Sequence, residues 1–130
     1  MPNSIFRVSA KALVFDDQGR LLLLKESDGR WEIPGGGIDD NESPRETIVR
    51  EIHEECGLAA RVLDEQPTAV WSVSHNDQFD FLYLGYRTAV DDIAGFVPSE
   101  ECVELKYIAL ADARALPACP SLKGYLSNLQ

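Results

Sequence analysis

The chain has 130 residues, 45% of them hydrophobic and 26% charged, and its formal net charge at pH 7 is -10. This length and composition are typical of one globular domain over residues 1–130 with a single core. The acidic charge argues against binding of a nucleic-acid backbone, which requires clustered Lys and Arg. We find no secretory signal and no apolar run that could span a membrane, so we expect a cytoplasmic protein.

Two strand-like runs open the chain. FRVSAKALVF (6–15) and RLLLLK (20–25) flank DDQG, whose Asp and Gly residues favour a turn, and this pattern predicts a hairpin. WEIPGGG follows, where Pro34 and three glycines should end any strand that begins at Trp31.

The second half of the chain is rich in strand-forming residues. We predict strands over 60–65, 68–75, 79–90 and 103–110, with SHNDQ (74–78) as a hairpin turn. Two short helices should close the chain over 110–116 and 121–129, the second with Ser121 as its N-cap. The order of strands, helix, strands and helix predicts an α/β fold in which helices cover a mixed sheet.

Three cysteines are widely spaced in the sequence. Cys56, Cys102 and Cys119 form no CxxC pair. Neither a zinc site nor a disulfide framework is indicated, and we expect reduced, partly buried thiols.

A helix is expected between the glycines and Gly57. Ser43 at the N-cap, Pro44 at the first helical position and Glu46 three residues after the cap form a capping-box pattern, and Gly57 is placed to end the helix. At about 100° per residue, a helix puts a stripe of apolar residues on one side, and this stripe should pack on the sheet. Its members are Ile48, Val49, Ile52 and Cys56.

The same helix gathers Glu51, Glu54 and Glu55 at three-residue and four-residue steps. Like charges at these steps destabilise a helix by roughly 0.2 to 0.5 kcal/mol per pair, and acids near a C-terminus oppose the macrodipole. A divalent cation would offset this repulsion, and oxygen ligands select Mg²⁺ or Mn²⁺ over zinc. Arg50 is placed to pair with Glu46 or Glu54 and to hold a carboxylate in position.

Gly35, Gly36 and Gly37 let the backbone approach a ligand closely or adopt positive φ. A backbone carbonyl from this loop and carboxylates from the helix would complete one metal shell, with Glu42 near the helix entrance.

The stretch from Gly36 to Leu58 resembles the Nudix box of the Nudix hydrolases, Gx5Ex7REUxEExGU, where U is an aliphatic residue. Glu42, Arg50 and the residues that follow match every required position. GRLLLLK and WEIPGG also resemble the hairpin and turn that precede the box in this family, so the similarity extends from Val8 to Leu58.

The resemblance implies an α/β/α sandwich with a mixed β-sheet. It implies Mg²⁺-dependent hydrolysis of the pyrophosphate bond in a nucleoside diphosphate linked to another group, with Mn²⁺ able to substitute. Carried over by position, Glu51, Glu54 and Glu55 would be metal ligands, the Gly35 carbonyl would assist, and Arg50 would orient Glu51. The family also allows a homodimer.

Members of the family differ in the catalytic base. Glu51 matches the box glutamate that serves in some of them, while others use a glutamate from a later loop or strand. Glu100, Glu101 and Glu104 are the candidates here, and we favour Glu104 among these three.

The substrate is expected to be a small nucleotide, either a nucleotide sugar such as ADP-ribose or a nucleoside triphosphate, including oxidised forms. Arg30, Phe79 and Phe81 are candidates for contacting it, since aromatic rings can stack on a base. A catalytically idle Nudix-like module that senses a nucleotide or binds a protein is the alternative, although such modules usually carry a damaged box. A calcium-binding acidic module is a weaker alternative, because the EF-hand spacing is missing.

Overall fold

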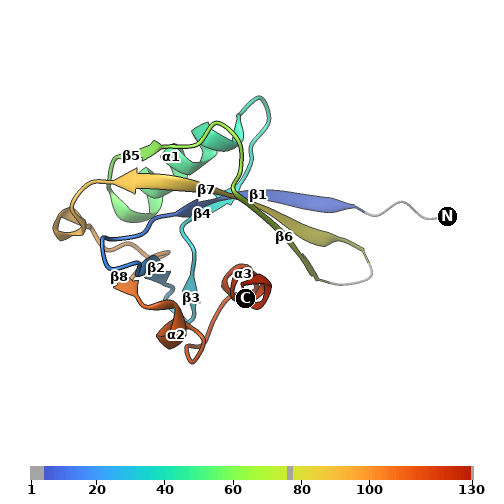
Figure 1. Cartoon of the computed structure of the whole chain (residues 1–130). Coiled ribbons are helices and arrows are strands. Elements are labelled where there is room, and N and C mark those ends of the chain that lie inside the picture. The colour runs from blue at the N-terminus through green and yellow to red at the C-terminus, as the bar shows by residue number, and fades with distance from the viewer. Residues whose placement is uncertain (1–4, 76–77, 130) are drawn as a thin grey trace.

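The computed structural model describes residues 5–75 and 78–129, and it has a mixed sheet as predicted (Figure 1). Strands β4 (Gly35–Gly37), β1 (Phe6–Leu13), β7 (Asp80–Val90) and β5 (Ala60–Val62) lie in that order, and β6 (Ala69–Ser74) also pairs with β7. The pairing of β1 with β7 is parallel, whereas β4, β5 and β6 pair antiparallel with their neighbours. The turn predicted at 74–78 includes residues 76 and 77, which lie outside the described residues.

A second sheet has the order β3 (Trp31–Glu32), β2 (Leu21–Lys25) and β8 (Glu104–Ile108). The predicted hairpin forms next to its turn: the Asp16 amide donates to the Arg20 carbonyl at 3.0 Å, the Leu22 amide donates to the Val14 carbonyl at 2.8 Å, and Phe15 and Leu21 form an antiparallel bridge. Beyond the turn the strands separate into different sheets, because β1 pairs with β7 along its whole length and β2 pairs with β8. These long-range ladders offer many more hydrogen bonds than the local hairpin would.

The four leucines of β2 show how the two sides of the molecule are filled. Leu22 and Leu24 pack into a core that includes α1 (Pro44–Cys56). Leu21 and Leu23 pack into a second core that includes α3 (Pro120–Asn128). Alternate residues of a strand face opposite sides, so an unbroken apolar run is the pattern of a strand buried on both faces. Each such side chain contributes about 1.5–3 kcal/mol on burial.

The helices lie on both sides of the sheets, as Figure 1 shows. Helix α1 contacts β1, β4 and β5, while α3 contacts β6 and β3. A short helix α2 (Leu110–Ala113) and a 3-10 turn η1 (Ile93–Gly95) complete the fold. The predicted α/β/α sandwich is confirmed. Within residues 5–75 and 78–129, no helix has the length and apolar character needed to cross a bilayer.

The ends of α1 are those that the sequence predicts. The Ser43 hydroxyl accepts from the Glu46 amide at 3.1 Å, and the Glu46 carboxylate accepts from the Ser43 amide at 3.0 Å. Gly57 ends the helix with φ 70, a left-handed conformation that suits glycine. Such a cap contributes about 1 kcal/mol and fixes where the glutamates of the last turns lie.

The buried face of α1 differs from the predicted stripe. Ile48, Ile52 and Cys56 are buried as expected, but the Val49 side chain is 42% exposed. Thr47 and Glu55 are buried instead. Compared with the predicted stripe, the buried face of the helix is shifted toward the side that carries Glu55. A carboxylate therefore packs against the sheet.

Two further predictions are corrected. Ser121 is not the N-cap of the last helix; Cys119 is, with Pro120 at the first helical position and Ser121 buried inside the first turn. Proline at the first position sets the helical φ, so the helix begins two residues earlier than an N-cap at Ser121 would place it. The glycines Gly35–Gly37 do not merely end a strand, because they form β4 themselves and pair with β1.

Candidate functional site

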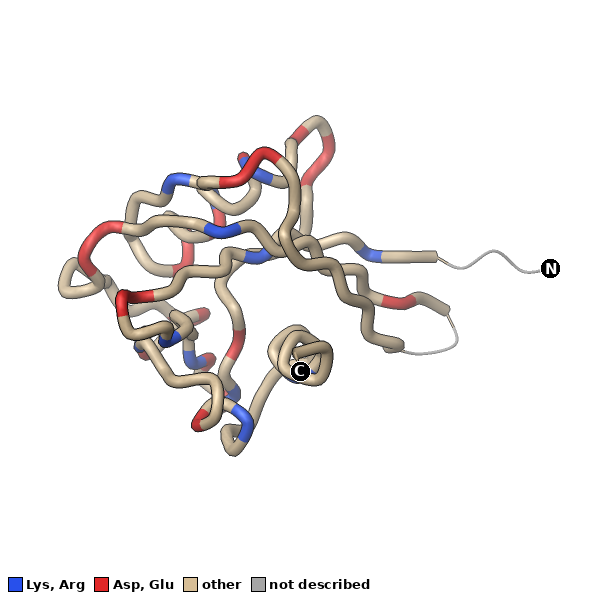
Figure 2. Tube along the Cα trace, viewed as in Figure 1, with Lys and Arg blue, Asp and Glu red and all other residues tan. Residues whose placement is uncertain are grey.

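The acidic residues of α1 divide between a buried and an exposed side. The Glu55 side chain is buried, and its Oε1 accepts a hydrogen bond from the Gly35 amide at 3.2 Å. Glu51 is half-buried and Glu54 is exposed. The carboxylates of the helix therefore range from one held against β4 to one exposed to solvent. Figure 2 marks the positions of the acidic residues along the chain in red.

Arg50 holds three of the box carboxylates at once. Its Nε donates to Glu42 Oε2 at 2.7 Å, and its Nη1 donates to Glu51 Oε1 at 3.0 Å and to Glu54 Oε2 at 3.2 Å. The Arg50 guanidinium, together with the Thr47 hydroxyl, lowers the pKa of Glu42 to about 2. Arg50 is thus hydrogen-bonded to Glu51, the residue that the resemblance implies it would orient. The expected pairing of Arg50 with Glu54 is confirmed, whereas Glu46 is engaged in the helix cap.

The glycine strand fits closely against these carboxylates. A Cβ atom on Gly36 would lie 2.6 Å from the Glu51 Cδ, so only glycine leaves the Glu51 carboxylate in its present position. Gly35 has φ 131, which side chains rarely adopt. The positive φ expected among these glycines is therefore present at Gly35, and the close neighbour of Gly36 is the Glu51 carboxylate.

The carboxyl of Glu55 is held in an environment that opposes its charge. Burial raises the pKa of Glu55 to about 8, and the charges of Glu51 and Glu32 act in the same direction. The Lys11 ammonium and the hydrogen bond from Gly35 oppose this shift. A divalent cation beside Glu55 would stabilise its ionised form, so these residues fit a hard metal ion.

The environment of Glu51 also opposes its charge, and it includes a further acidic residue, Glu101. Burial raises the pKa of Glu51, the neighbouring charges of Glu54 and Glu101 add to the rise, and Arg50 opposes it. Glu101 lies in the loop before β8, close enough to act on Glu51. Glu104 lies in β8 with its Cα opposite that of Lys25 and its side chain exposed.

A cavity of about 310 Å³ adjoins the glycine strand. Its lining comes from β1, β3, β4, β7, the β2–β3 turn and the start of α3, namely Ser9, Lys11, Glu26, Arg30, Glu32, Gly35, Gly36, Gly37, Phe81, Tyr83, Cys119, Pro120 and Ser121. Two of the three predicted substrate contacts, Arg30 and Phe81, line this cavity. The third, Phe79, lies just before β7, and its ring packs edge-on against that of Phe81 with centroids 5.4 Å apart.

A larger hollow, of about 580 Å³, lies between α1 and β5 and is lined partly by Val49, Arg45 and Arg61. Glu51, Glu54 and Glu55 do not line it. These three glutamates do not line the smaller cavity either. The smaller cavity is the better candidate for the site because it contacts the glycine strand that touches both Glu51 and Glu55.

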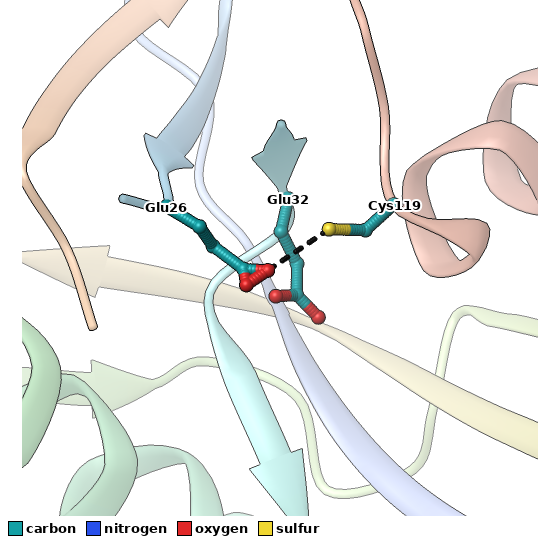
Figure 3. Close-up of side chains that lie close together, drawn as sticks. All are labelled: Glu26, Glu32 and Cys119. Carbon is teal, nitrogen blue, oxygen red and sulfur yellow. Dashed lines mark hydrogen bonds between the residues drawn. The ribbon is translucent and has the colours of Figure 1, made fainter. Parts of the chain in front are cut away.

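The cavity also contains a polar group that the sequence did not reveal (Figure 3). Glu26 at the end of β2, Glu32 in β3 and Cys119 at the start of α3 bring their side-chain ligand atoms within 4.8 Å of one another. The buried Lys11 ammonium donates to Glu32 Oε1 at 2.8 Å. A lysine in an otherwise apolar strand was the available signal, because a buried charge requires a partner.

Backbone hydrogen bonds between β3 and the segment before α3 hold Cys119 next to Glu26 and Glu32. The Trp31 amide donates to the Pro117 carbonyl, and the Cys119 amide donates to the Trp31 carbonyl, both at 2.9 Å. Cys56, Cys102 and Cys119 are all free and buried, which agrees with the expected reduced thiols.

Fold and site together define an α/β protein in which an acidic helix and a glycine strand meet beside a polar cavity. The Nudix domain model matches residues 5–129. A Mycobacterium tuberculosis protein named "Putative 8-oxo-dGTP diphosphatase 3" is 33% identical over 103 residues, which are 78% of this chain and 48% of that protein. An RNA pyrophosphohydrolase of Saccharophagus degradans is 46% identical over 55 residues, which are 41% of this chain and 32% of that protein.

Among solved structures, a MutT Nudix hydrolase from Burkholderia pseudomallei is 26% identical, with a TM-score of 0.74 and coverage of 98% of this chain and 100% of that chain. The chain belongs to the Nudix domain family. It spans about half the length, or less, of the curated relatives described above.

Proposed function

We propose that the protein is a divalent-metal-dependent pyrophosphohydrolase that acts on a nucleoside diphosphate linked to another group. The observation that carries this proposal is the contact of two partly buried carboxylates, Glu51 and Glu55, with one glycine strand. Buried acids with raised pKa values and closely spaced like charges are a frequent feature of catalytic sites. The intact box and the names of the relatives support the same activity.

Glu51, Glu54, Glu55 and the Gly35 carbonyl would hold the metal, which we propose to be Mg²⁺ with Mn²⁺ as a substitute. All four donors are oxygens, as hard divalent ions prefer. When bound, such an ion supplies neutralisation of phosphate charge and a bound water of lowered pKa. This provides the local positive charge that an acidic chain needs to accept an anionic substrate.

The protein's own groups would position the substrate. The glycine strand lets phosphate oxygens approach the backbone without a side chain in the way. Arg50 fixes Glu51 and Glu54 so that their carboxylates need not reorganise during the reaction. The cavity of about 310 Å³ would hold the part of the substrate beyond the diphosphate, in contact with Arg30 and Phe81.

We propose Glu101 as the base from outside the box, in preference to Glu104. Both side chains are exposed, so the choice rests on the charge of Glu101, which acts on Glu51 and adds to the rise of its pKa. Glu101→Gln is expected to lower kcat by about 10²-fold or more, the usual contribution of a general base. Glu104→Gln is the matched control and should stay within about twofold of the wild type; the reverse order of effects would restore Glu104 as the base. If neither substitution lowers kcat, Glu51 would be the favoured base.

The proposal is tested by incubating the protein with nucleoside triphosphates, oxidised triphosphates and nucleotide sugars such as ADP-ribose, with and without Mg²⁺. Product masses show which bond was broken. Release of a nucleoside monophosphate that requires the metal is the expected result. Nucleotide binding by isothermal titration without turnover of any compound would instead indicate an idle sensing module.

A further inference from the structure

Two of the three cysteines meet at a junction that the proposed reaction does not use. Cys56 is the last residue of α1, and Cys102 lies in the loop before β8. Both side chains are buried in the same core, at 1% and 0% exposure. Their thiols are hydrogen-bonded to each other. The Cys102 thiol itself donates to the Glu104 carbonyl at 3.4 Å, so Cys56 is the donor between the two sulfur atoms.

The loop that carries Cys102 is also bound to the last turn of α1 through the backbone. The Val97 amide donates to the Cys56 carbonyl at 3.1 Å, and the Ser99 hydroxyl donates to the Glu55 carbonyl at 3.2 Å. The Ser99 hydroxyl in turn accepts from the Cys102 amide at 3.1 Å. Two cysteines can be joined only where their backbones already lie close together, and these contacts supply that closeness.

Cys102 is the buried residue of an otherwise open loop. Between residues 97 and 103, the chain forms neither helix nor strand, and only Ser99 and Cys102 are not exposed. Opening of such a segment costs much less free energy than global unfolding. It would bring Cys102 to solvent while α1 and the core beneath it stay folded. A buried thiol without such a route would be inert.

We propose that Cys56 and Cys102 form a reversible disulfide on oxidation by hydrogen peroxide, and that this disulfide lowers the turnover of the site. When the loop opens, the Cys102 sulfur attacks one peroxide oxygen and the O–O bond breaks. Cys102 becomes a sulfenic acid, and the released hydroxide leaves as water with the thiol proton.

The second step takes place when the loop closes again. The Cys56 sulfur attacks the Cys102 sulfur, the S–O bond breaks, and a second water leaves with the proton of Cys56. The two thiols lose two electrons in total, and the peroxide is reduced to two waters. An added dithiol reverses the reaction by exchange with the disulfide.

The effect on turnover rests on the proposed function, and it follows from the neighbours of the two cysteines. Glu55 precedes Cys56, and Glu101 precedes Cys102. An S–S bond of about 2.05 Å is much shorter than a hydrogen bond between two sulfur atoms, so one segment must shift. Helix α1 is fixed by its caps and its buried face, so the loop moves and changes the position of Glu101 relative to Glu51. A shift of about 1 Å in a reacting group causes a large loss of rate.

The test treats the reduced wild type with hydrogen peroxide and measures its mass before and after dithiothreitol. The protein should lose two hydrogen atoms and regain them. Trypsin places the three cysteines in three peptides, residues 51–61, 88–106 and 115–123, and the first two should be linked. Turnover with Mg²⁺, measured after the peroxide is removed, should fall about tenfold or more and return with dithiothreitol.

Cys56→Ala and Cys102→Ala should each abolish the link and the reversible loss of turnover. Cys119→Ser is the matched control, because it removes a thiol that donates to Glu26 Oε1 at 3.0 Å instead of to another cysteine. It should form the link as the wild type does. Each variant is compared with its own reduced form, so that differences in basal activity do not enter, and thermal melts verify the fold. Peptide mapping of the wild type does not depend on any variant.

Peptides 51–61 and 88–106 that stay unlinked in the wild type would overturn the inference, and so would a link through peptide 115–123. A linked protein that keeps the turnover of its reduced form would overturn it as well, because the loop would then not control the site. Absence of metal-dependent turnover in the reduced protein would instead overturn the proposed function, and the mass measurement would still decide whether the disulfide forms.

Discussion

Glu55→Gln is expected to abolish Mg²⁺-dependent pyrophosphate hydrolysis, lowering kcat/KM by about 10³-fold or more. Removal of a carboxylate that would hold the metal costs several kcal/mol of transition-state stabilisation, and each 1.36 kcal/mol is tenfold in rate. The measurement is a phosphate or nucleotide release assay at saturating Mg²⁺. A fully active Gln variant would refute the assignment of Glu55 to the metal site.

Thermal unfolding in EDTA separates this loss from misfolding. Glutamine has the shape of Glu55 and keeps an oxygen for the Gly35 amide. The pKa of Glu55 is raised to about 8, so its stabilising effect is complete below the unfolded pKa near 4.5 and is lost as the pH rises toward 8. The metal-free wild type should therefore lose stability over this range through Glu55, and the Gln variant should not. At pH 8 the variant should have a Tm at least equal to that of the wild type.

Gly36→Ala is expected to lower activity about 10²-fold with a change in unfolding free energy of about 1 kcal/mol or less. The new Cβ would lie 2.6 Å from Glu51 Cδ and 2.7 Å from its Oε1, so the carboxylate must move. The displaced atoms are the end of a flexible side chain, which explains the small effect on stability. Displacement of a reacting group by about 1 Å is enough for such a loss of rate. The measurements are kcat with Mg²⁺ and denaturant unfolding.

Gly35→Ala provides the contrasting variant. Its Cβ would overlap the carbonyl oxygen of Ala10 and lie 2.9 Å from the Lys11 Cα, and the residue has φ 131. Backbone atoms in a paired strand cannot move as a side chain does, so we expect a loss of about 3 kcal/mol or more in unfolding free energy. Equal effects of the two substitutions on stability would contradict the packing described for β4.

Most of α1 was predictable from the sequence. The capping box at Ser43, the end at Gly57 and the spacing of Glu51, Glu54 and Glu55 are all local signals, read within a few residues of one another. The family and its sandwich fold were predictable for the same reason, because the box is a contiguous motif. The exposed Val49 shows the limit of this reasoning, since periodicity defines a stripe but not how the helix rotates against the sheet.

The strand pairing required the tertiary structure. Local turn chemistry correctly predicts the bend near Asp16, yet β1 leaves its hairpin partner to pair with β7, far along the chain. The sequence predicts that Gly35–Gly37 end a strand, but they form one, because β1 supplies an edge with which they pair. Pairing depends on which edges come together, and a residue's neighbours in sequence carry no information about that.

The sequence by itself determined the acidic helix and the run of glycines before it, and hence the chemistry that we propose for the diphosphate. Only the tertiary structure decided the composition of the cavity. The thiol of Cys119 and the carboxylate of Glu26 are 93 residues apart in the chain and hydrogen-bonded in space. Local hydrogen bonds and helix spacing leave a signature in short stretches of sequence, whereas contacts made by packing distant elements do not, and the groups that line the cavity are of the second kind.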